Sequence, residues 1–410
     1  MREMKDSGIS WIADIPEHWS VSKIGGLYSL RVTKVSDRDY PPLSVTNKGI
    51  LPQLETAAKT NAHDDRKPVC KGDFAINSRS DRRGSCGISS YTGSVSLINT
   101  ILRPMTEMHP QYYDWLFHTI QFGDEFYKWG HGIVDDLWTT GWQDMKKISI
   151  PPPPITEQAV IADFLDEQCA EIDSLISDIQ SQIEALEEYK RSVITEAVTK
   201  GLDPDVEMRD SGVQWIGEIP THWTLIRIGS LYGLRTQKVS DIDYPPLSVT
   251  KMGVLPQLDT VAKTNAHDDR KLVVKGDFVI NSRSDRRGSC GISDYTGSVS
   301  LINTVLFPIT EMNPRYYNWY FHTVGFADEF YRWGHGIVDD LWTTGWQDMK
   351  NILISVPPLD EQQRIADYLD SKCAEIDNII TEKKQQIETI EEYKKSLIFE
   401  YVTGKKEVQE

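Results

Sequence analysis

Two identical stretches of the sequence concentrate side chains that can bind nucleic acid. The segment NSRSDRRGSCGIS spans residues 77–89 and occurs unchanged at residues 281–293. Arginine can pair with guanine edges, asparagine with adenine, and serine can reach phosphate oxygens. A solvated turn in which Asp81 pairs with an arginine explains the segment equally well. The DNA-contacting residues predicted here are Asn77, Ser78, Arg79, Ser80, Arg82 and Arg83, with Asn281, Ser282, Arg283, Ser284, Arg286 and Arg287 in the second copy.

A second identical pair offers weaker candidates. GHGIVDDLWTTGWQDMK occupies residues 130–146 and 334–350, and it combines a Gly-His-Gly turn with acids, threonines and tryptophans. We interpret Trp138 and Trp142 as packing residues rather than as platforms for stacked bases. His131, Thr139 and Thr140 are the plausible surface contacts. The further DNA contacts that we predict are His63, Arg66, His131 and Thr139, with His267, Arg270, His335 and Thr343 in the second copy.

The sequence lacks the motifs of a catalytic or cofactor-binding site. It has neither a phosphate loop ending in Gly-Lys-Ser/Thr nor a GxGxxG turn. DYPPLS, at residues 39–44 and 243–248, resembles the Asp-Pro-Pro-Tyr of adenine methyltransferases, but its tyrosine precedes the prolines, which favours a turn before a strand. HDDRK, at residues 63–67, lacks a partner at metal-ligand spacing, which favours a polar loop. We therefore expect no enzymatic activity, no cofactor and no metal in this chain.

The charge of −17 over 410 residues at first argues against a nucleic-acid partner. Its distribution changes that conclusion. Residues 151–200 and 357–410 hold a net charge of −13, whereas residues 1–150 and 201–356 hold only −4. Five cysteines without a CxxC motif favour a reducing cytoplasm, and neither a secretory signal nor a membrane-spanning apolar run is evident.

The chain consists of one unit used twice, at a constant offset of 204 residues. Residues 6–150 and 210–354 share 109 identities in 145 positions, and residues 151–200 and 355–404 share 27 in 50. Solenoid repeats are far shorter than this. Two large copies in one chain instead favour a pseudo-twofold pair, the intramolecular version of a symmetric dimer.

Each unit predicts an α+β globular domain followed by a long helix. Short alternating runs separated by turn residues predict strands, and aromatic residues at helical spacing predict helices. A heptad of apolar residues follows in each copy, interrupted by Lys383 in the second, and Thr156 or Asp360 can cap the helix. The heptad residues are Leu165, Cys169, Ile172, Ile176, Ile179, Ile183, Leu186 and Val193, with Leu369, Cys373, Ile376, Ile380, Ile387, Ile390 and Leu397 in the second copy. The predicted parts are a domain at 1–153, a helix at 154–203, a domain at 204–357 and a helix at 358–410.

Three motifs give the chain a resemblance to a known family. DSGVQWIGEIPTHW opens the second unit, VPPLDEQQRIADYLD opens its long helix and IEEYKKSLIFEYVTGK closes it, and the first unit has matching segments. Together they resemble the specificity subunit of type I restriction-modification systems, over essentially the whole chain.

The resemblance implies how such a chain works. Each globular domain is a target recognition domain that reads one half of a split site in double-stranded DNA. The helices pair as an antiparallel coiled coil and hold the domains at a fixed separation. Two methyltransferase subunits dock and supply catalysis and the S-adenosylmethionine site, and restriction subunits can join that core. Family members usually carry dissimilar domains, so the near identity of these two implies one half-site read twice, as an interrupted palindrome.

A different class of function also fits the sequence. An assembly or scaffold protein would use the globular domains to bind protein and the coiled coil as a spacer. The near-neutral charge of the domains slightly favours this alternative, and the repeated arginine-rich segment argues against it. Salt-dependent binding to DNA would discriminate between the two, because phosphate contacts weaken steeply as salt rises.

Overall fold

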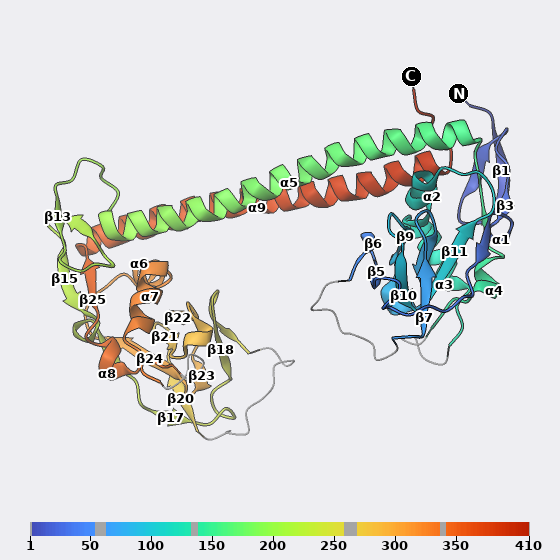
Figure 1. Ribbon diagram of the computed structural model, residues 1–410. Helices are drawn as coiled ribbons and strands as arrows, with labels where there is room; N and C mark the ends of the chain where they lie inside the picture. Colours follow the sequence, from blue (N-terminus) through green and yellow to red (C-terminus); the bar gives the residue numbers. More distant parts are fainter. Residues whose placement is uncertain (1, 54–62, 133–137, 258–268, 337–341, 410) are drawn as a thin grey trace. The chain divides into compact units, whose positions relative to one another are not determined.

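The computed structural model describes residues 2–53, 63–132, 138–257, 269–336 and 342–409 (Figure 1). It contains two compact units, one formed by Met1–Ile179 with Lys384–Glu410 and the other by Gln180–Lys383. Each unit therefore combines one globular domain with part of both long helices. Among the described residues, no helix is long and apolar enough to cross a membrane.

The globular domains contain matching strands and helices in the same order, except that β17 is named only in the second domain and that a 3₁₀ helix, η3, stands there in place of α1. The first consists of β1 (Met4–Ile9), β2 (Ala13–Pro16), β3 (Ser22–Lys23), α1 (Ile24–Leu27), β4 (Tyr28–Leu30), β5 (Leu43–Thr46), β6 (Gly49–Pro52), β7 (Arg66–Val69), β8 (Phe74–Asn77), the 3₁₀ helix η1 (Ser80–Arg82), β9 (Cys86–Ile88), β10 (Gly93–Ser96), β11 (Asn99–Pro104), α2 (Pro110–Phe117), α3 (Ile120–Lys128), α4 (Trp142–Met145) and β12 (Ser149–Ile150). The second consists of β13 (Met208–Asp210), β14 (Glu218–Pro220), β15 (Thr224–Arg227), η3 (Ile228–Ser230), β16 (Tyr232–Leu234), β17 (Lys238–Val239), β18 (Leu247–Thr250), β19 (Gly253–Pro256), β20 (Arg270–Val273), β21 (Phe278–Asn281), η4 (Ser284–Arg286), β22 (Cys290–Ile292), β23 (Gly297–Ser300), β24 (Asn303–Pro308), α6 (Pro314–Phe321), α7 (Val324–Arg332), α8 (Trp346–Met349) and β25 (Leu353–Val356).

A four-stranded antiparallel sheet, in the order β4-β11-β8-β9, forms the centre of the first domain. Its middle strand β8 is buried on both faces, because side chains alternate along a strand. Phe74 and Ile76 enter the larger core, and Ala75 enters a smaller core with Val95 and Ile101. The second domain repeats this with the order β16-β24-β21-β22. The predicted α+β class is confirmed.

Aromatic side chains from α2 and α3 cover one face of the sheet. Phe117 packs on Phe74 with ring centroids 4.3 Å apart and on Phe122 at 4.7 Å. Thr119 caps α3 by accepting a hydrogen bond from the Phe122 amide. This packing fixes the position of α3 relative to the end of β8, where the arginine-rich segment begins.

The long helices α5 (Ile155–Lys200) and α9 (Leu359–Val402) run antiparallel within each unit (Figure 1). In the first unit, Lys394 on α9 forms an ion pair with Asp173 on α5 at 2.6 Å. In the second unit, Lys190 on α5 forms the matching pair with Asp377 on α9 at 2.7 Å. The described heptad residues are buried or half-buried, as the spacing predicts. Lys383 interrupts the seam, and its amino group donates a hydrogen bond to Gln182.

The helices begin differently from the prediction. Thr156 and Asp360, expected as caps, lie inside the first turn, because the helices start at Ile155 and Leu359. The buried Gln158 side chain joins α5 to the domain instead. It accepts a hydrogen bond from the His109 amide at 2.9 Å and donates one to the Pro153 carbonyl at 2.8 Å. Gln362 makes the same two bonds at the start of α9, with Asn313 and Pro357.

The preceding residue, Glu157, adds a second connection. Its carboxylate accepts hydrogen bonds from Trp19, His18 and Arg2. Burial opposes ionisation of Glu157, but these three donors outweigh it and lower the pKa below its ordinary value of 4.5. The connection therefore stabilises the fold above that value and is lost as the pH falls through the lowered pKa.

The buried heptad seam gives a first prediction. Ile183 is 2% exposed, so Ile183→Asp should place an unpaired charge in an apolar environment. We expect this to destabilise the second unit by roughly 3–5 kcal/mol. Ile183→Val, which removes one methylene, should lower stability by about 1 kcal/mol. Thermal unfolding of both variants measures this, and equal melting temperatures for the two would contradict a buried seam.

Candidate nucleic-acid interface

Within each domain, the two segments that recur unchanged in the sequence lie together: residues 77–89 lie beside residues 130–146 in the first copy. Arg79 pairs with Thr139 in an antiparallel bridge. The Ser80 amide donates to the Trp138 carbonyl, and the Thr140 amide donates to the Ser78 carbonyl, both at 3.0 Å. The second copy repeats the bridge between Arg283 and Thr343. Segments 60 residues apart thus form one surface in each domain, which sequence spacing alone does not predict.

The arginine-rich segment is held in a defined conformation. The Asn77 side chain accepts a hydrogen bond from the Arg79 amide at 3.1 Å, and η1 follows directly. Gly84 closes the turn with a φ of 74°, in the region that favours glycine. The Tyr127 hydroxyl donates to the carbonyls of Asn77 and Arg82, at 3.1 and 3.3 Å. Burial raises the pKa of Tyr127, so this hydroxyl keeps its proton and remains a donor.

Each arginine of the segment has a carboxylate nearby. Asp81 lies 3.0 Å from Arg79 and 3.9 Å from Arg82, and Asp124 on α3 lies 2.9 Å from Arg83. The pairing of Asp81 with Arg79 fits the alternative interpretation of the sequence, a solvated turn in which Asp81 pairs with an arginine. Such exposed pairs contribute only about 0–1 kcal/mol, so a stronger partner can displace them. The second copy has the same pairs: Arg283–Asp285, Arg286–Asp285 and Arg287–Asp328.

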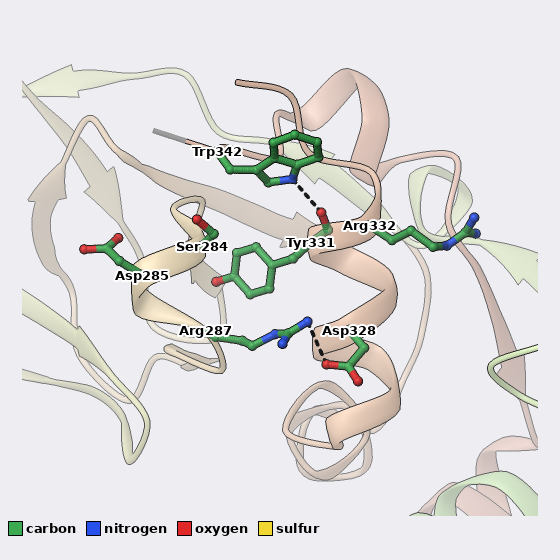
Figure 2. Close-up of a pocket in the computed structure, with 7 residues that line it drawn as sticks. All are labelled: Ser284, Asp285, Arg287, Asp328, Tyr331, Arg332 and Trp342. Carbon is green, nitrogen blue, oxygen red and sulfur yellow. Dashed lines mark hydrogen bonds and ion pairs between the residues drawn. The ribbon is translucent and has the colours of Figure 1, made fainter. Parts of the chain in front are cut away.

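A cleft lies beside the arginines in both domains. Figure 2 shows it in the second copy, where Arg287 and Asp328 point toward one another and Trp342 lies over Tyr331. The cleft has a volume of about 750 Å³ there and about 740 Å³ in the first copy. The lining residues of the first copy are Ser80, Asp81, Arg83, Asp124, Tyr127, Lys128 and Trp138. Only Lys128 differs between the copies, as Arg332.

The segment at residues 130–146 mainly supports the arginine-rich segment at residues 77–89. The Trp138 indole donates to the Tyr127 carbonyl at 2.9 Å, and Trp142 packs against the larger core. Thr140, expected at the surface, is instead fully buried, with its hydroxyl donating to the Phe126 carbonyl. A Cβ at Gly130 would lie 1.9 Å from the Trp138 indole nitrogen, so this position requires glycine.

The histidines and Thr139 lie apart from the cleft lining. His131 is exposed, exchanges backbone hydrogen bonds with Thr139, and lies 3.4 Å from Asp144. His335 does the same with Thr343 and Asp348. The His63 ring lies 2.8 Å from the Asp37 carboxylate, and its match His267 lies outside the described residues.

Two predicted pairs are interior. Arg66 is 5% exposed, and its guanidinium donates to the hydroxyl and carbonyl of Ser94. Arg270 makes the same bonds to Ser298. Ser78 is buried with its hydroxyl against Thr100, and Ser282 against Thr304. These side chains hold strands together, so we leave all four out of the interface proposed below.

The structure adds residues that sequence reasoning missed. Asp124, Tyr127 and Lys128 of α3 line the cleft more than 40 residues after the arginines. The aromatic residues at helical spacing in this segment predict a helix but no contact with the arginines. The one available signal was that Asp124 and Tyr127 recur unchanged as Asp328 and Tyr331.

Comparison with known proteins finds a matching family model and similar proteins. Residues 222–389 match the type I restriction modification DNA specificity domain, and residues 18–185 are the equivalent part of the first copy. The MjaX type I restriction enzyme specificity subunit of Methanocaldococcus jannaschii is 28% identical over 273 residues. That match spans 64% of this chain and 60% of the relative. The chain therefore carries a type I restriction modification DNA specificity domain and is similar to type I restriction enzyme specificity subunits.

Further comparisons find similar proteins. The MjaVIII specificity subunit of the same organism is 26% identical, over 71% of this chain and 69% of the relative. A chain from a structure on complex assembly and conformational transition of the type I restriction-modification system has a TM-score of 0.69 at 13% identity, covering 95% of this chain and 99% of that chain. The HsdS subunit from Thermoanaerobacter tengcongensis has a TM-score of 0.53 at 15% identity, covering 95% and 98%. These two structures share the fold of this chain.

The close contact at Gly130 gives a second prediction. Gly130→Ala combined with Gly334→Ala should displace both indoles, because the new Cβ atoms would lie 1.9 and 2.1 Å from the indole nitrogens. We expect a loss of roughly 1–3 kcal/mol and faster amide exchange at residues 77–83, since the Trp138 carbonyl accepts from Ser80. Gly123→Ala is the matched control, because its Cβ meets nothing within 4 Å and the second copy already has Ala327 there. Unchanged exchange in the double variant would disprove this coupling.

Proposed function

We propose that this chain is the non-catalytic, DNA-reading subunit of a type I restriction-modification complex. The observation that carries the proposal is the arginine-bearing cleft, which occurs in both target recognition domains with one lining residue changed. The match to a DNA specificity domain and the similarity to specificity subunits support sequence-specific DNA recognition as its role. The interface that we propose consists of the cleft and the exposed arginines beside it.

The energetics of the arginine pairs fit recognition rather than fold stability. An exposed ion pair contributes about 0–1 kcal/mol, whereas a bidentate arginine–base contact contributes about 1–3 kcal/mol of discrimination. Exchange of a carboxylate for a base edge is therefore favourable at the correct sequence. Arg82 is the best candidate for a phosphate contact, because its side chain is 69% exposed and lies 3.9 Å from Asp81.

The repeat supports a bipartite site with related halves. The clefts present the same side chains except at one position, Lys128 or Arg332. The ion pair between α5 and α9 has its lysine on α9 in the first unit and on α5 in the second. Two large copies of one unit in a chain are the intramolecular version of a symmetric dimer. We propose that each copy reads the same bases on opposite strands, which makes the site an interrupted palindrome.

The partners follow from the family rather than from this chain's own side chains. The sequence has no catalytic motif, so we propose that two methyltransferase subunits supply the S-adenosylmethionine site and the methyl transfer. Restriction subunits can join the same assembly. In this proposal the chain recognises DNA and scaffolds the enzymes that modify or cut it.

Arg82 and its match Arg286 give a third prediction, which tests the proposal. Replacing both with alanine should weaken binding to all duplexes alike and flatten the dependence of log affinity on log salt by about 2, because two phosphate contacts are lost. Titration of labelled duplex at several salt concentrations measures both effects.

The control removes two exposed cations from matched positions outside the cleft, Lys23→Ala with Arg227→Ala. Its salt slope should stay near that of the parent chain. Salt-independent or absent DNA binding by the parent chain would favour the alternative, a scaffold protein whose near-neutral domains bind protein.

A further inference from the structure

The Arg83–Asp124 ion pair is more constrained than a surface pair needs to be. The Arg83 guanidinium lies 2.9 Å from Asp124 and 5.5 Å from the centre of the Tyr127 ring. The Tyr127 hydroxyl also holds the backbone on both sides of η1. A ring on one side and a carboxylate on the other therefore orient the guanidinium, although both charged side chains are more than 60% exposed.

The second copy reproduces this arrangement. Arg287 lies 2.8 Å from Asp328 and 5.7 Å from the centre of the Tyr331 ring. One neighbouring residue differs between the copies, as Lys128 and Arg332, and the pair has the same geometry in both. Because an exposed ion pair adds little stability, fold stability alone does not account for the repeated geometry.

The pair presents hydrogen-bond donors beside an acceptor. Guanidinium has five N–H donors, enough to bind a base and the carboxylate together, and an ionised carboxylate only accepts. In the major groove, guanine offers two adjacent acceptors, N7 and O6, and its cytosine partner offers the N4 amino donor. An A·T pair separates its two acceptors by a donor, so it cannot take the arginine fork.

Phosphate fits the pair poorly. A phosphate carries only acceptors and a negative charge, so approach to Arg83 brings it close to the Asp124 carboxylate, which repels it. Arg82 has a more distant carboxylate, at 3.9 Å, and is better placed for phosphate. Arg82 is therefore suited to contact the phosphate backbone of DNA, and Arg83 is suited to contact a base.

We propose that the Arg83–Asp124 and Arg287–Asp328 pairs each read one G·C base pair, with arginine on guanine and aspartate on the cytosine amino group. This inference rests on the proposed function and adds the identity of one base pair in each half-site. It makes Asp124 and its equivalent in the second copy, Asp328, specificity-determining residues.

Selection from a random duplex library tests the inference, because it requires no assumption about the sequence of the site. The parent chain and the Asp124→Asn, Asp328→Asn variant are used to enrich bound 40-base-pair duplexes, which are then sequenced. The parent motif should contain a G·C pair in each half that relaxes in the variant by roughly 5- to 100-fold in preference, while the other positions persist. The variant should also bind unrelated duplex more tightly.

The matched control, Asp14→Asn with Glu218→Gln, makes the same charge change at exposed equivalent positions on β2 and β14. It should leave the motif unchanged. A variant motif identical to the parent's, or relaxation at an A·T pair, would overturn the inference while leaving the proposed function intact. If the parent chain enriches no motif, the proposed function fails, and this inference fails with it.

Discussion

The pair of hydrogen bonds from the Tyr127 hydroxyl to the carbonyls of Asn77 and Arg82 is the interaction on which the candidate interface depends. It attaches the arginine-rich segment to α3, which the aromatic packing on β8 fixes in turn. The ring of Tyr127 supports Arg83, and the backbone carbonyl of Tyr127 accepts a hydrogen bond from the Trp138 indole. One buried residue, Tyr127, therefore sets the position of residues 77–83 and of Trp138. Tyr331 does the same in the second copy.

The differences between the copies show which parts of the domain tolerate change. Phe307 pairs across the sheet with Gly233, and a Cβ at Gly233 would lie 2.6 Å from the phenyl ring. The first copy has Arg103 and Ser29 at these positions, so ring and glycine changed together. Asn47 and Lys251 differ at matching positions of a turn between two short strands. The cleft retains the same chemistry while its surroundings vary.

Local patterns in the sequence predicted the parts of the fold that depend on local physics. The heptad placed the buried seam of α5 and α9 correctly, because apolar spacing determines which face of a helix packs. It did not predict the helix starts, which depend on Gln158 and Gln362 bonding to distant backbone groups. Among the site residues, Arg82 and Arg83 are exposed and Arg79 is half-buried, whereas Arg66 and Thr140 are interior. Asp124 and Tyr127 were missed because their role depends on a contact across more than 40 residues of sequence.

The central claim is that two equivalent clefts read the same half-site twice. Genome-wide mapping of DNA methylation, in cells with the gene and in cells lacking it, tests this most directly. The account predicts a gene-dependent motif made of a short half-site, a spacer of unspecified bases and the reverse complement of that half-site. With adenine methyltransferase partners, as the family implies, one modified adenine should lie in each half, on opposite strands. A gene-dependent motif with two unrelated half-sites would contradict the account, because the clefts that the copies share could not then be the parts that read DNA.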